Sequence, residues 1–123
     1  MNILGIDDNE DILKLLKTVL TSKGHDFTQV GNGKEGVKLI EKQNFDAILL
    51  DLTMPEFSGV DVIESLKKSN NLKDQKIIIF TASSATDKEV DELLQNEGVS
   101  SCIRKPVDIN VLIKKVEEVV KSS

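Results

Sequence analysis

The sequence is poor in aromatic residues, in cysteine and in long apolar runs. Aromatic side chains make up 3% of its 123 residues, with no Trp or Tyr, so a core has to be built mainly from Ile, Leu and Val. The one cysteine, Cys102, cannot form an intrachain disulfide, which predicts a reducing, cytoplasmic setting. The longest apolar runs, 47–50 and 77–80, are too short to cross a bilayer, and the first residues lack the pattern of a signal peptide.

An excess of basic residues is also missing. The formal net charge is −5, whereas nucleic-acid-binding proteins usually carry a basic surface that neutralises phosphates. We therefore expect no direct nucleic-acid partner, and no membrane partner either. What is present, 39% hydrophobic and 30% charged residues, is typical of a globular protein, and the length suits one domain over residues 1–123.

Short apolar runs alternate with longer stretches of helical periodicity along the chain. Strands are predicted at residues 2–6, 26–30, 47–50, 76–80 and 101–103. After each strand, apolar residues recur at three- and four-residue spacing, which predicts five helices. The third of these helices is expected to bury Val60, Ile63 and Leu66.

Several residues indicate how the helices begin and end. Thr86 followed by Glu89 is typical of a capping box that opens the fourth helix, and Gly98 is expected to close it. Asp108 is predicted to cap the fifth helix. His25 falls in a turn and is interpreted as an exposed residue without a function.

Strict alternation of strands and helices predicts a parallel sheet, because parallel neighbours are joined by crossover helices that cover both faces. For five strands the best match is a doubly wound, flavodoxin-like sheet of order 2-1-3-4-5 in a three-layer α/β sandwich. Sheets of this kind bind ligands beyond the carboxyl ends of the strands, where the strand order reverses. We therefore expect the chemistry of this chain beyond its first and third strands.

Polar residues follow four of the five predicted strands. Asp7 and Asp8 follow the first strand, Asp51 the third and Thr81 the fourth, and the fifth runs into Lys105. The second strand, an edge strand in this order, ends in chemically silent residues. The predicted fold thus collects three carboxylates, a hydroxyl and an ammonium group in one pocket.

Three carboxylates in one pocket repel each other, by about 4 kcal/mol per close pair at an effective dielectric constant of about 20. Such a cluster requires a cation, raised pKa values, or both. Mg2+ suits carboxylates, water and phosphate oxygens, and no His or Cys is expected near this pocket to favour a softer metal. A carboxylate opposite Lys105 could then act as a nucleophile on phosphorus, with Thr81 as a further phosphate ligand.

Four segments, each at a predicted strand end, carry a resemblance to a known family. They are residues 6–10 (IDDNE), 51–55 (DLTMP) with Gly59, 81–82 (TA) and 105–106 (KP). In this order they resemble the motifs of response-regulator receiver domains, the CheY-like superfamily, and in particular its stand-alone chemotaxis-type and relay-type members. The resemblance covers nearly the whole chain.

The resemblance implies a role for each acidic residue. Asp51 would be the phosphoacceptor. Asp8, Asp51 and the backbone carbonyl of Thr53 would bind Mg2+, and Asp7 would act on the ion directly or through water.

The resemblance also implies roles around the phosphate. Thr81 would be the switch hydroxyl and Lys105 the cation that senses the phosphate, with a cis bond between Lys105 and Pro106. Thr53 and Ser83 fall at the two variable positions that shape the access of the hydrolytic water.

The chain departs from the family pattern in two places. Receiver domains usually carry Tyr or Phe three residues before the lysine, and here that residue is Cys102, which is too small to fill the space of a rotating ring. The segment from Thr81 to Gly98 is also two residues longer than is typical, with the extra length expected within 83–86. We therefore hypothesise that signalling depends on this loop and the fourth helix more than on a ring.

These predictions together describe a two-component switch that catalyses only its own phosphorylation and dephosphorylation. A histidine kinase or histidine phosphotransfer protein would donate the phosphoryl group, and a partner protein would read the fourth helix, fifth strand and fifth helix. No output domain is expected. Two alternatives stay open: an unphosphorylated interaction module with the same fold, and a phosphatase of the haloacid dehalogenase type. The phosphatase class requires a second Asp two residues after the nucleophile, where this chain has Thr53.

Overall fold

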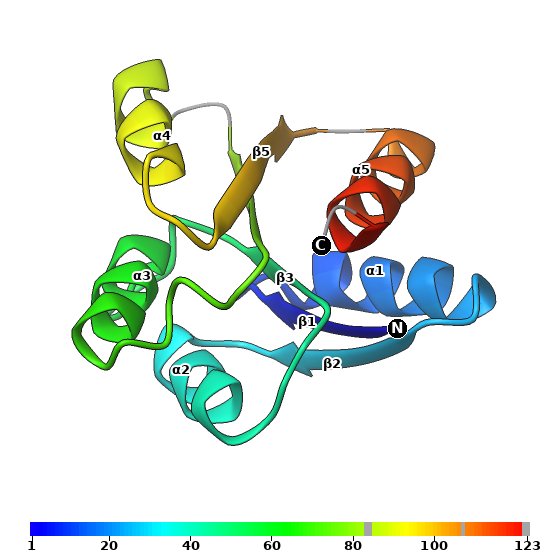
Figure 1. The fold of residues 1–123 in the computed structure, drawn as a ribbon. Helices are drawn as coiled ribbons and strands as arrows, with labels where there is room; N and C mark the ends of the chain where they lie inside the picture. The colour runs from blue at the N-terminus through cyan, green and yellow to red at the C-terminus, as the bar shows by residue number, and fades with distance from the viewer. Residues whose placement is uncertain (83–84, 107, 122–123) are drawn as a thin grey trace.

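The computed structural model describes residues 1–82, 85–106 and 108–121, along which strands and helices alternate (Figure 1). In chain order the elements are β1 Asn2–Ile6, α1 Glu10–Ser22, β2 Asp26–Val30, α2 Gly33–Lys42, β3 Ala47–Leu50, α3 Gly59–Lys68, β4 Ile77–Ala82, α4 Asp87–Leu94, β5 Val99–Lys105 and α5 Ile109–Lys121. β4 and β5 continue beyond their predicted ends because backbone pairing carries on through polar residues that an apolar pattern does not mark.

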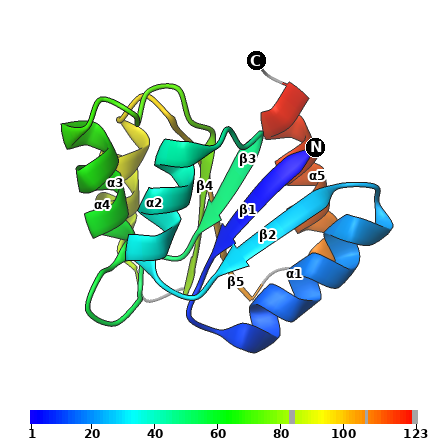
Figure 2. The ribbon, with the colours of Figure 1, turned by 90° about the horizontal axis from the view of Figure 1, so that it is seen from below.

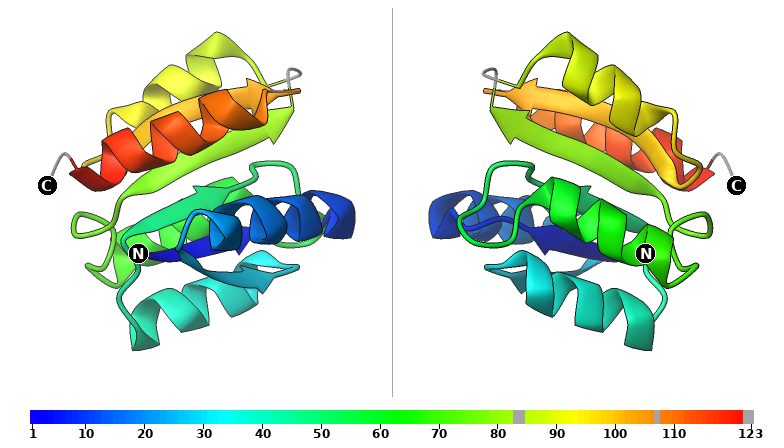
Figure 3. Two further views of the ribbon diagram at one scale, coloured as in Figure 1. Left: turned by 90° about the vertical axis from the view of Figure 1, so that its right-hand side faces the viewer. Right: turned by 90° about the vertical axis from the view of Figure 1, so that its left-hand side faces the viewer.

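The strands form one parallel sheet of order β2-β1-β3-β4-β5, as predicted. Helices α1 and α5 cover one face of this sheet, and α2, α3 and α4 cover the other (Figures 2 and 3). The central strand β3 is buried along its whole length, whereas the edge strand β2 is half-exposed. The architecture is the predicted flavodoxin-like sandwich, and it sets the carboxyl ends of β1 and β3 side by side.

Two apolar clusters, one on each face of the sheet, form the core, and Ile, Leu and Val supply most of it. Successive side chains of a strand point to opposite faces. Ile79 and Cys102 accordingly belong to the cluster on the α4 side, whereas Phe80 and Ile103 belong to the cluster beneath α1 and α5. This alternation decides which residues near the site can reach α4.

The buried face of α3 differs from the predicted one at its first turn. Val60 is 41% exposed, whereas Val62, Ile63 and Leu66 are fully buried. Gly59 and these three residues lie on one side of the helix, so Val60 faces solvent. The predicted burial of Val60 is therefore wrong.

His25 is also not the exposed residue that the sequence predicts. Only 9% of its surface is accessible, and its Nε2 lies 3.6 Å from Oε2 of Glu117 on α5. A position after a glycine in a turn indicates exposure only when no other element packs over the turn. Here α5 packs over it. His25 therefore belongs to the contact between the α1–β2 turn and α5, far from the carboxyl ends of the strands.

The predicted caps at Thr86 and Asp108 are confirmed, although at Thr86 the structure shows only one of the two bonds of a capping box. The Thr86 hydroxyl accepts a hydrogen bond from the backbone N–H of Glu89 at 3.1 Å at the start of α4. The Asp108 carboxylate accepts one from the N–H of Asn110 at 2.8 Å at the start of α5. Helix α4 ends at Leu94 with Gln95 as its C-cap, so the prediction that Gly98 closes this helix is wrong. Gly98 lies in the turn before β5 at a φ of +100°, a conformation that L side chains rarely adopt. Among the described residues, no helix has the length and apolar character needed to span a membrane.

Candidate functional site

The candidate site lies beyond the carboxyl ends of β1 and β3. The backbone N–H of Asp7 donates to the carbonyl of Val30 at 3.2 Å, and the N–H of Asp51 donates to the carbonyl of Ile6 at 3.0 Å. Sheet-like pairing thus continues into both acidic residues. Their backbones are held by the sheet and not by a free loop.

Asp7, Asp8 and Asp51 come together as the strand order predicts. Each offers one carboxylate oxygen, and these oxygens lie within 4.8 Å of one another. Asp7 and Asp51 are 3% and 5% exposed, whereas Asp8 faces solvent. The cluster is therefore buried on one side and open to an incoming ion or phosphate on the side of Asp8.

Local hydrogen bonds orient the two buried carboxylates. Oδ1 of Asp51 accepts the backbone N–H of Thr53 at 3.1 Å, and Oδ1 of Asp7 accepts the N–H of Asn9 at 2.9 Å. Asn9 in turn caps α1 through its own side chain. Each bond occupies one oxygen and leaves Oδ2 to face the pocket. Sequence reasoning missed Asn9, although Asn is a preferred residue before a helix.

Lys105 reaches this pocket from the end of β5. Its Nζ lies 2.7 Å from Oδ2 of Asp7 and 3.8 Å from Oδ2 of Asp51. The same ammonium lies 5.1 Å from the centroid of the Phe80 ring, a contact with no signal in the sequence. The Lys105–Pro106 peptide is cis, as predicted. The predicted cation is thus beside the predicted acceptor.

The environment of Asp51 makes its charged form costly. Burial is the main cause that raises the pKa of this carboxyl, and the nearby charges of Asp7 and Asp8 raise it further. The hydrogen bond from Thr53 and the charge of Lys105 act in the opposite direction, but the pKa stays above its ordinary value. Lys105 and the hydrogen bond from Thr53 therefore do not offset the combined effect of burial and the two neighbouring carboxylates on Asp51.

Thr81 lies at the end of β4 with no exposed surface. Among the described residues its Oγ1 is one of the few buried side-chain atoms without a hydrogen-bond partner. A buried hydroxyl without a partner costs free energy, so such a group at a strand end is a sign that a ligand completes it. A phosphoryl oxygen would be a suitable acceptor.

The donor set fits Mg2+. It consists of hard carboxylate oxygens from Asp7, Asp8 and Asp51, close enough to share one ion, and no softer ligand of the described residues joins the cluster. Burial, with the charges of Asp7 and Asp8, raises the pKa of Asp51, and a bound cation would favour the charged form of this carboxyl. The role of the Thr53 backbone carbonyl stays a prediction, and Ser83 lies outside the described residues.

Gly59 shapes the loop after Asp51. A Cβ atom on this residue would collide with the carbonyl oxygen of Asp51 and would lie 2.8 Å from Cα of Leu52. Its N–H donates to the carbonyl of Leu52 at 3.1 Å. The first turn of α3 therefore packs directly against the backbone of Asp51, and only glycine allows this approach.

Cys102 is half-buried on the α4 face of β5. Burial raises the pKa of its thiol, and the charge of Arg104 acts in the opposite direction. Residues 83–84 lie outside the described residues, so the expected location of the longer loop is not tested; α4 begins at Asp87. Sequence reasoning did not single out Arg104, whose position in the strand gives no pattern to detect.

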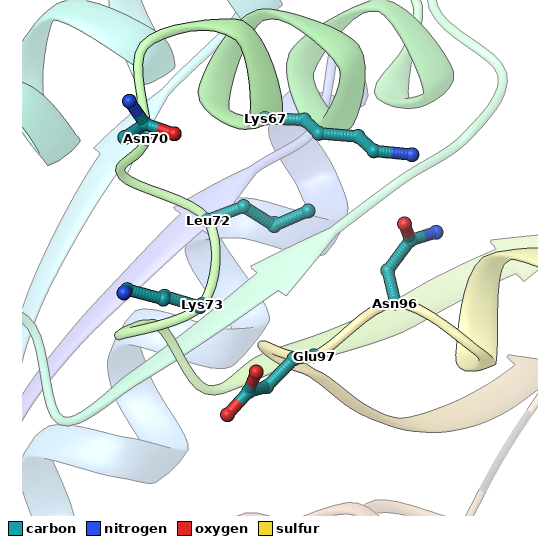
Figure 4. A pocket seen from close by; sticks show the side chains of 6 residues that line it. All are labelled: Lys67, Asn70, Leu72, Lys73, Asn96 and Glu97. Carbon is teal, nitrogen blue, oxygen red and sulfur yellow. The ribbon is translucent and has the colours of Figure 1, made fainter.

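A separate surface hollow of about 220 Å³ lies at the opposite end of the strands, beside the amino ends of β4 and β5 (Figure 4). It is lined by Lys67, Asn70, Leu72, Lys73, Asn96 and Glu97. Figure 4 shows that Lys67 and Asn96 extend into the same space, whereas Lys73 and Glu97 point elsewhere. Because its polar groups do not converge, this hollow is a poor candidate for the functional site.

Comparisons with known proteins agree with the geometry. Residues 3–117 match the family described as the response regulator receiver domain. The chain is 32% identical over 115 residues to the CAI-1 autoinducer sensor kinase/phosphatase CqsS of Vibrio cholerae, covering 93% of this chain but 16% of that protein. It is 28% identical to the polar-differentiation response regulator DivK of Brucella anthropi, covering 94% of this chain and 93% of that one. The chain also spans 27% of the Escherichia coli transcriptional regulatory protein GlrR.

Solved structures show the same likeness. The receiver domain of a Francisella response regulator is 32% identical, with a TM-score of 0.83 over 97% of this chain and 95% of that one. The response regulator TrrA of Thermotoga maritima, solved in complex with Mg2+ and BeF, is 30% identical, with a TM-score of 0.80 over 97% and 99%. The chain described here belongs to the response regulator receiver domain family, whose members are signalling switches of two-component systems.

Proposed function

We propose that this chain is a phosphorylation-controlled switch in which Asp51 accepts a phosphoryl group from a histidine kinase or a histidine phosphotransfer protein. One observation carries the proposal above all. The ammonium of Lys105 lies 3.8 Å from Oδ2 of Asp51 inside a cluster of three carboxylates. Phosphoryl transfer depends mainly on positioning and on neutralising the phosphoryl oxygens, and this arrangement supplies both.

Asp51 supplies the nucleophile. One carboxylate oxygen forms a bond to phosphorus while the bond between phosphorus and the imidazole nitrogen of the donor breaks. The electron pair of the broken bond stays on that nitrogen, which takes up a proton. The N–H of Thr53 holds Oδ1 of Asp51 throughout and so keeps Oδ2 directed at the phosphate side of the pocket.

The remaining pocket residues bind the phosphoryl oxygens and the metal. Lys105, which is paired with Asp7 at 2.7 Å, would bind one oxygen, and the Thr81 hydroxyl, which has no partner among the described residues, would donate to another. Asp8, Asp51 and the carbonyl of Thr53 would hold Mg2+, with Asp7 in contact directly or through water. When bound, Mg2+ supplies positive charge that offsets the carboxylates and the phosphoryl group.

The added charge would change what a partner protein meets. An acyl phosphate on Asp51 would carry about −1.5 to −2 units of charge in place of the single negative charge of the carboxylate, in a pocket bounded by the ends of β4 and β5. We place the partner surface on α4, β5 and α5. In this proposal the chain acts in the cytoplasm, and Thr53 and Ser83 tune the lifetime of the phosphoryl group.

The test is a phosphoryl adduct measured by intact mass after incubation with Mg2+ and a small phosphodonor such as acetyl phosphate. The parent protein is expected to gain one phosphoryl group, and Asp51→Asn to gain none. Asp91→Asn, which removes an exposed carboxylate from α4, is the matched control and should label like the parent.

Three results would contradict the proposal. If the parent stays unlabelled under conditions that label another receiver domain, the chain is an unphosphorylated interaction module. If it instead turns over a generic phosphomonoester continuously, it is a phosphatase. Labelling that persists in Asp51→Asn would move the acceptor to another residue.

A further inference from the structure

The last two residues of β5 point to opposite faces of the sheet. Lys105 faces the acidic pocket and the Phe80 ring, on the side of α1 and α5. Arg104 faces the other way, because successive side chains of a strand alternate. A shift of the Lys105 backbone would therefore also move Arg104, whose side chain lies on the α4 face.

Arg104 holds the start of α4. Its Nη1 donates to the carbonyl of Ala85 at 2.6 Å, and its Nη2 donates to Oδ1 of Asp87, the first residue of α4, at 2.9 Å. Hydrogen bonds from a charged guanidinium are stronger than neutral ones, and the rigid fork of arginine binds two acceptors in one fixed geometry. The side chain is 32% exposed, so it lies at the edge of the core and not free in solvent.

Arg104 also lies beside the predicted switch hydroxyl. The register of β4 and β5 pairs Thr81 with Arg104 and Ile79 with Cys102. Ile79 and Cys102 both belong to the cluster on the α4 side, so Thr81 and Arg104, two residues further along, share that face. The side chain of Cys102 on this face is short, whereas the side chain of Arg104 is long enough to contact the start of α4.

We propose that Arg104 is the positioning residue that couples the acidic pocket to α4, in place of the aromatic residue that Cys102 replaces. The inference rests on the proposed phosphorylation of Asp51. A phosphoryl group bound by Lys105 and Thr81 shifts these two residues. Arg104 follows because it is covalently joined to Lys105 and paired with Thr81, and its guanidinium transmits the shift to Ala85 and Asp87.

The test uses beryllofluoride with Mg2+ as a phosphoryl mimic and amide chemical shifts as the readout. Arg104→Met keeps an apolar stem and removes the guanidinium, and Arg104→Lys keeps the charge but not the fork. Lys88→Met is the matched control, because it removes one positive charge from the exposed side of α4. In the parent, amides of residues 87–94 are expected to shift on addition of the mimic.

The variants should differ in how the amide shifts of α4 respond to beryllofluoride. Arg104→Met is expected to lose most of the α4 shift change while residues 51–54 still respond, and Arg104→Lys to recover part of it. Lys88→Met should respond like the parent. If Arg104→Met keeps the full α4 response, the inference is wrong while the phosphorylation itself stands. If the parent forms neither an adduct by mass nor a response at residues 51–54, the proposed function fails and the inference fails with it.

The thiol of Cys102 supplies a second readout that a purely structural role of Arg104 would not move. Burial raises the pKa of this thiol and the charge of Arg104 acts in the opposite direction, so the alkylation rate reports on the nearby guanidinium. The rate at fixed pH is expected to change when the parent binds beryllofluoride, and this change should be lost in Arg104→Met. An unchanged rate in the parent would show that the guanidinium stays in place, against the inference.

Discussion

The acidic pocket and the α4 face of β5 lie at the ends of the same strands, but they are held together in different ways. In the pocket, Asp7 and Asp51 are buried, their backbones continue the pairing of the sheet, and Lys105 contacts both. On the α4 face, the half-exposed guanidinium of Arg104 forms a salt bridge with Asp87, whose side chain is almost entirely in solvent.

This difference separates the chemistry from its readout. Moving a pocket residue disturbs the sheet itself, because backbone hydrogen bonds hold Asp7 and Asp51 in place. Replacing the side chain of Arg104 or Asp87 removes a salt bridge near the surface, which is worth little free energy, and leaves the backbone pairing of β5 in place. Large effects of substitution are therefore expected in the pocket, and small effects on stability with large effects on signalling are expected near α4.

Mg2+ should have the largest effect on stability. An ion that binds only the folded protein stabilises it by about 2.7 kcal/mol at a concentration 100 times its Kd. We expect the urea midpoint of the parent to rise with Mg2+ and that of Asp51→Asn to rise far less. Asp91→Asn, outside the pocket, should respond like the parent; an equal response of all three would place the ion elsewhere.

Gly59→Ala should be the most damaging substitution next to the pocket. Its Cβ would collide with backbone atoms of Asp51 and Leu52, which cannot rotate away, and such overpacking costs about 2 kcal/mol. Gly31→Ala is the matched control, because nothing lies within 4 Å of its Cβ. The urea midpoint and the adduct yield should both fall for Gly59→Ala and not for Gly31→Ala. If both stay unchanged in Gly59→Ala, the loop after Asp51 can shift to make room for the extra methyl group.

Asp51→Asn should stabilise the metal-free protein at neutral pH. The pKa of Asp51 is raised in the folded state, so the folded protein binds this proton more tightly than the unfolded chain does. Stability is therefore lost as the pH rises from the ordinary value of 3.8 through the raised folded value.

Removing this carboxylate should gain on the order of 1 kcal/mol at neutral pH, a fraction of the repulsion between close carboxylates. Urea unfolding in EDTA across the acid range measures both the gain and the flatter pH dependence. A loss of stability in Asp51→Asn would show that its contact with Lys105 outweighs the burial of its charge.

Asp87→Asn should have the smallest effect on stability. Its exposed ion pair with Arg104 and its place in the first turn of α4 together contribute about 0.5 kcal/mol. Asp91→Asn, further along the same helix, should be nearly neutral in the same urea experiment. A loss of several times this size would mean that the contact between Arg104 and Asp87 contributes as much to the free energy of unfolding as the contacts in the pocket do.

The fold and the meeting of the acidic residues could be predicted from the sequence because both follow from periodicity. Alternating apolar runs indicate a parallel sheet, and the strand order brings the residues after β1 and β3 together. Thr86 and Asp108 were equally readable, because capping is a local interaction between residues two or three positions apart.

What could not be predicted depends on contacts between distant segments. His25 is buried because α5 packs over a turn, and Val60 is exposed because of the rotation of α3 against the sheet. The contacts of Arg104 with Ala85 and Asp87 depend on the distance between β5 and α4 in three dimensions. No pattern in the neighbouring residues carries that information.

The alternation of Arg104 and Lys105 has a consequence for how this chain can change over evolution. Because the two residues serve opposite faces, Arg104 can be exchanged without removing the Lys105 ammonium from the pocket, as long as β5 keeps its length. Inserting or deleting a single residue before Lys105 would instead turn the ammonium away from the carboxylates. Output specificity can therefore diversify by substitution, while insertions and deletions at this strand end should be purged by selection.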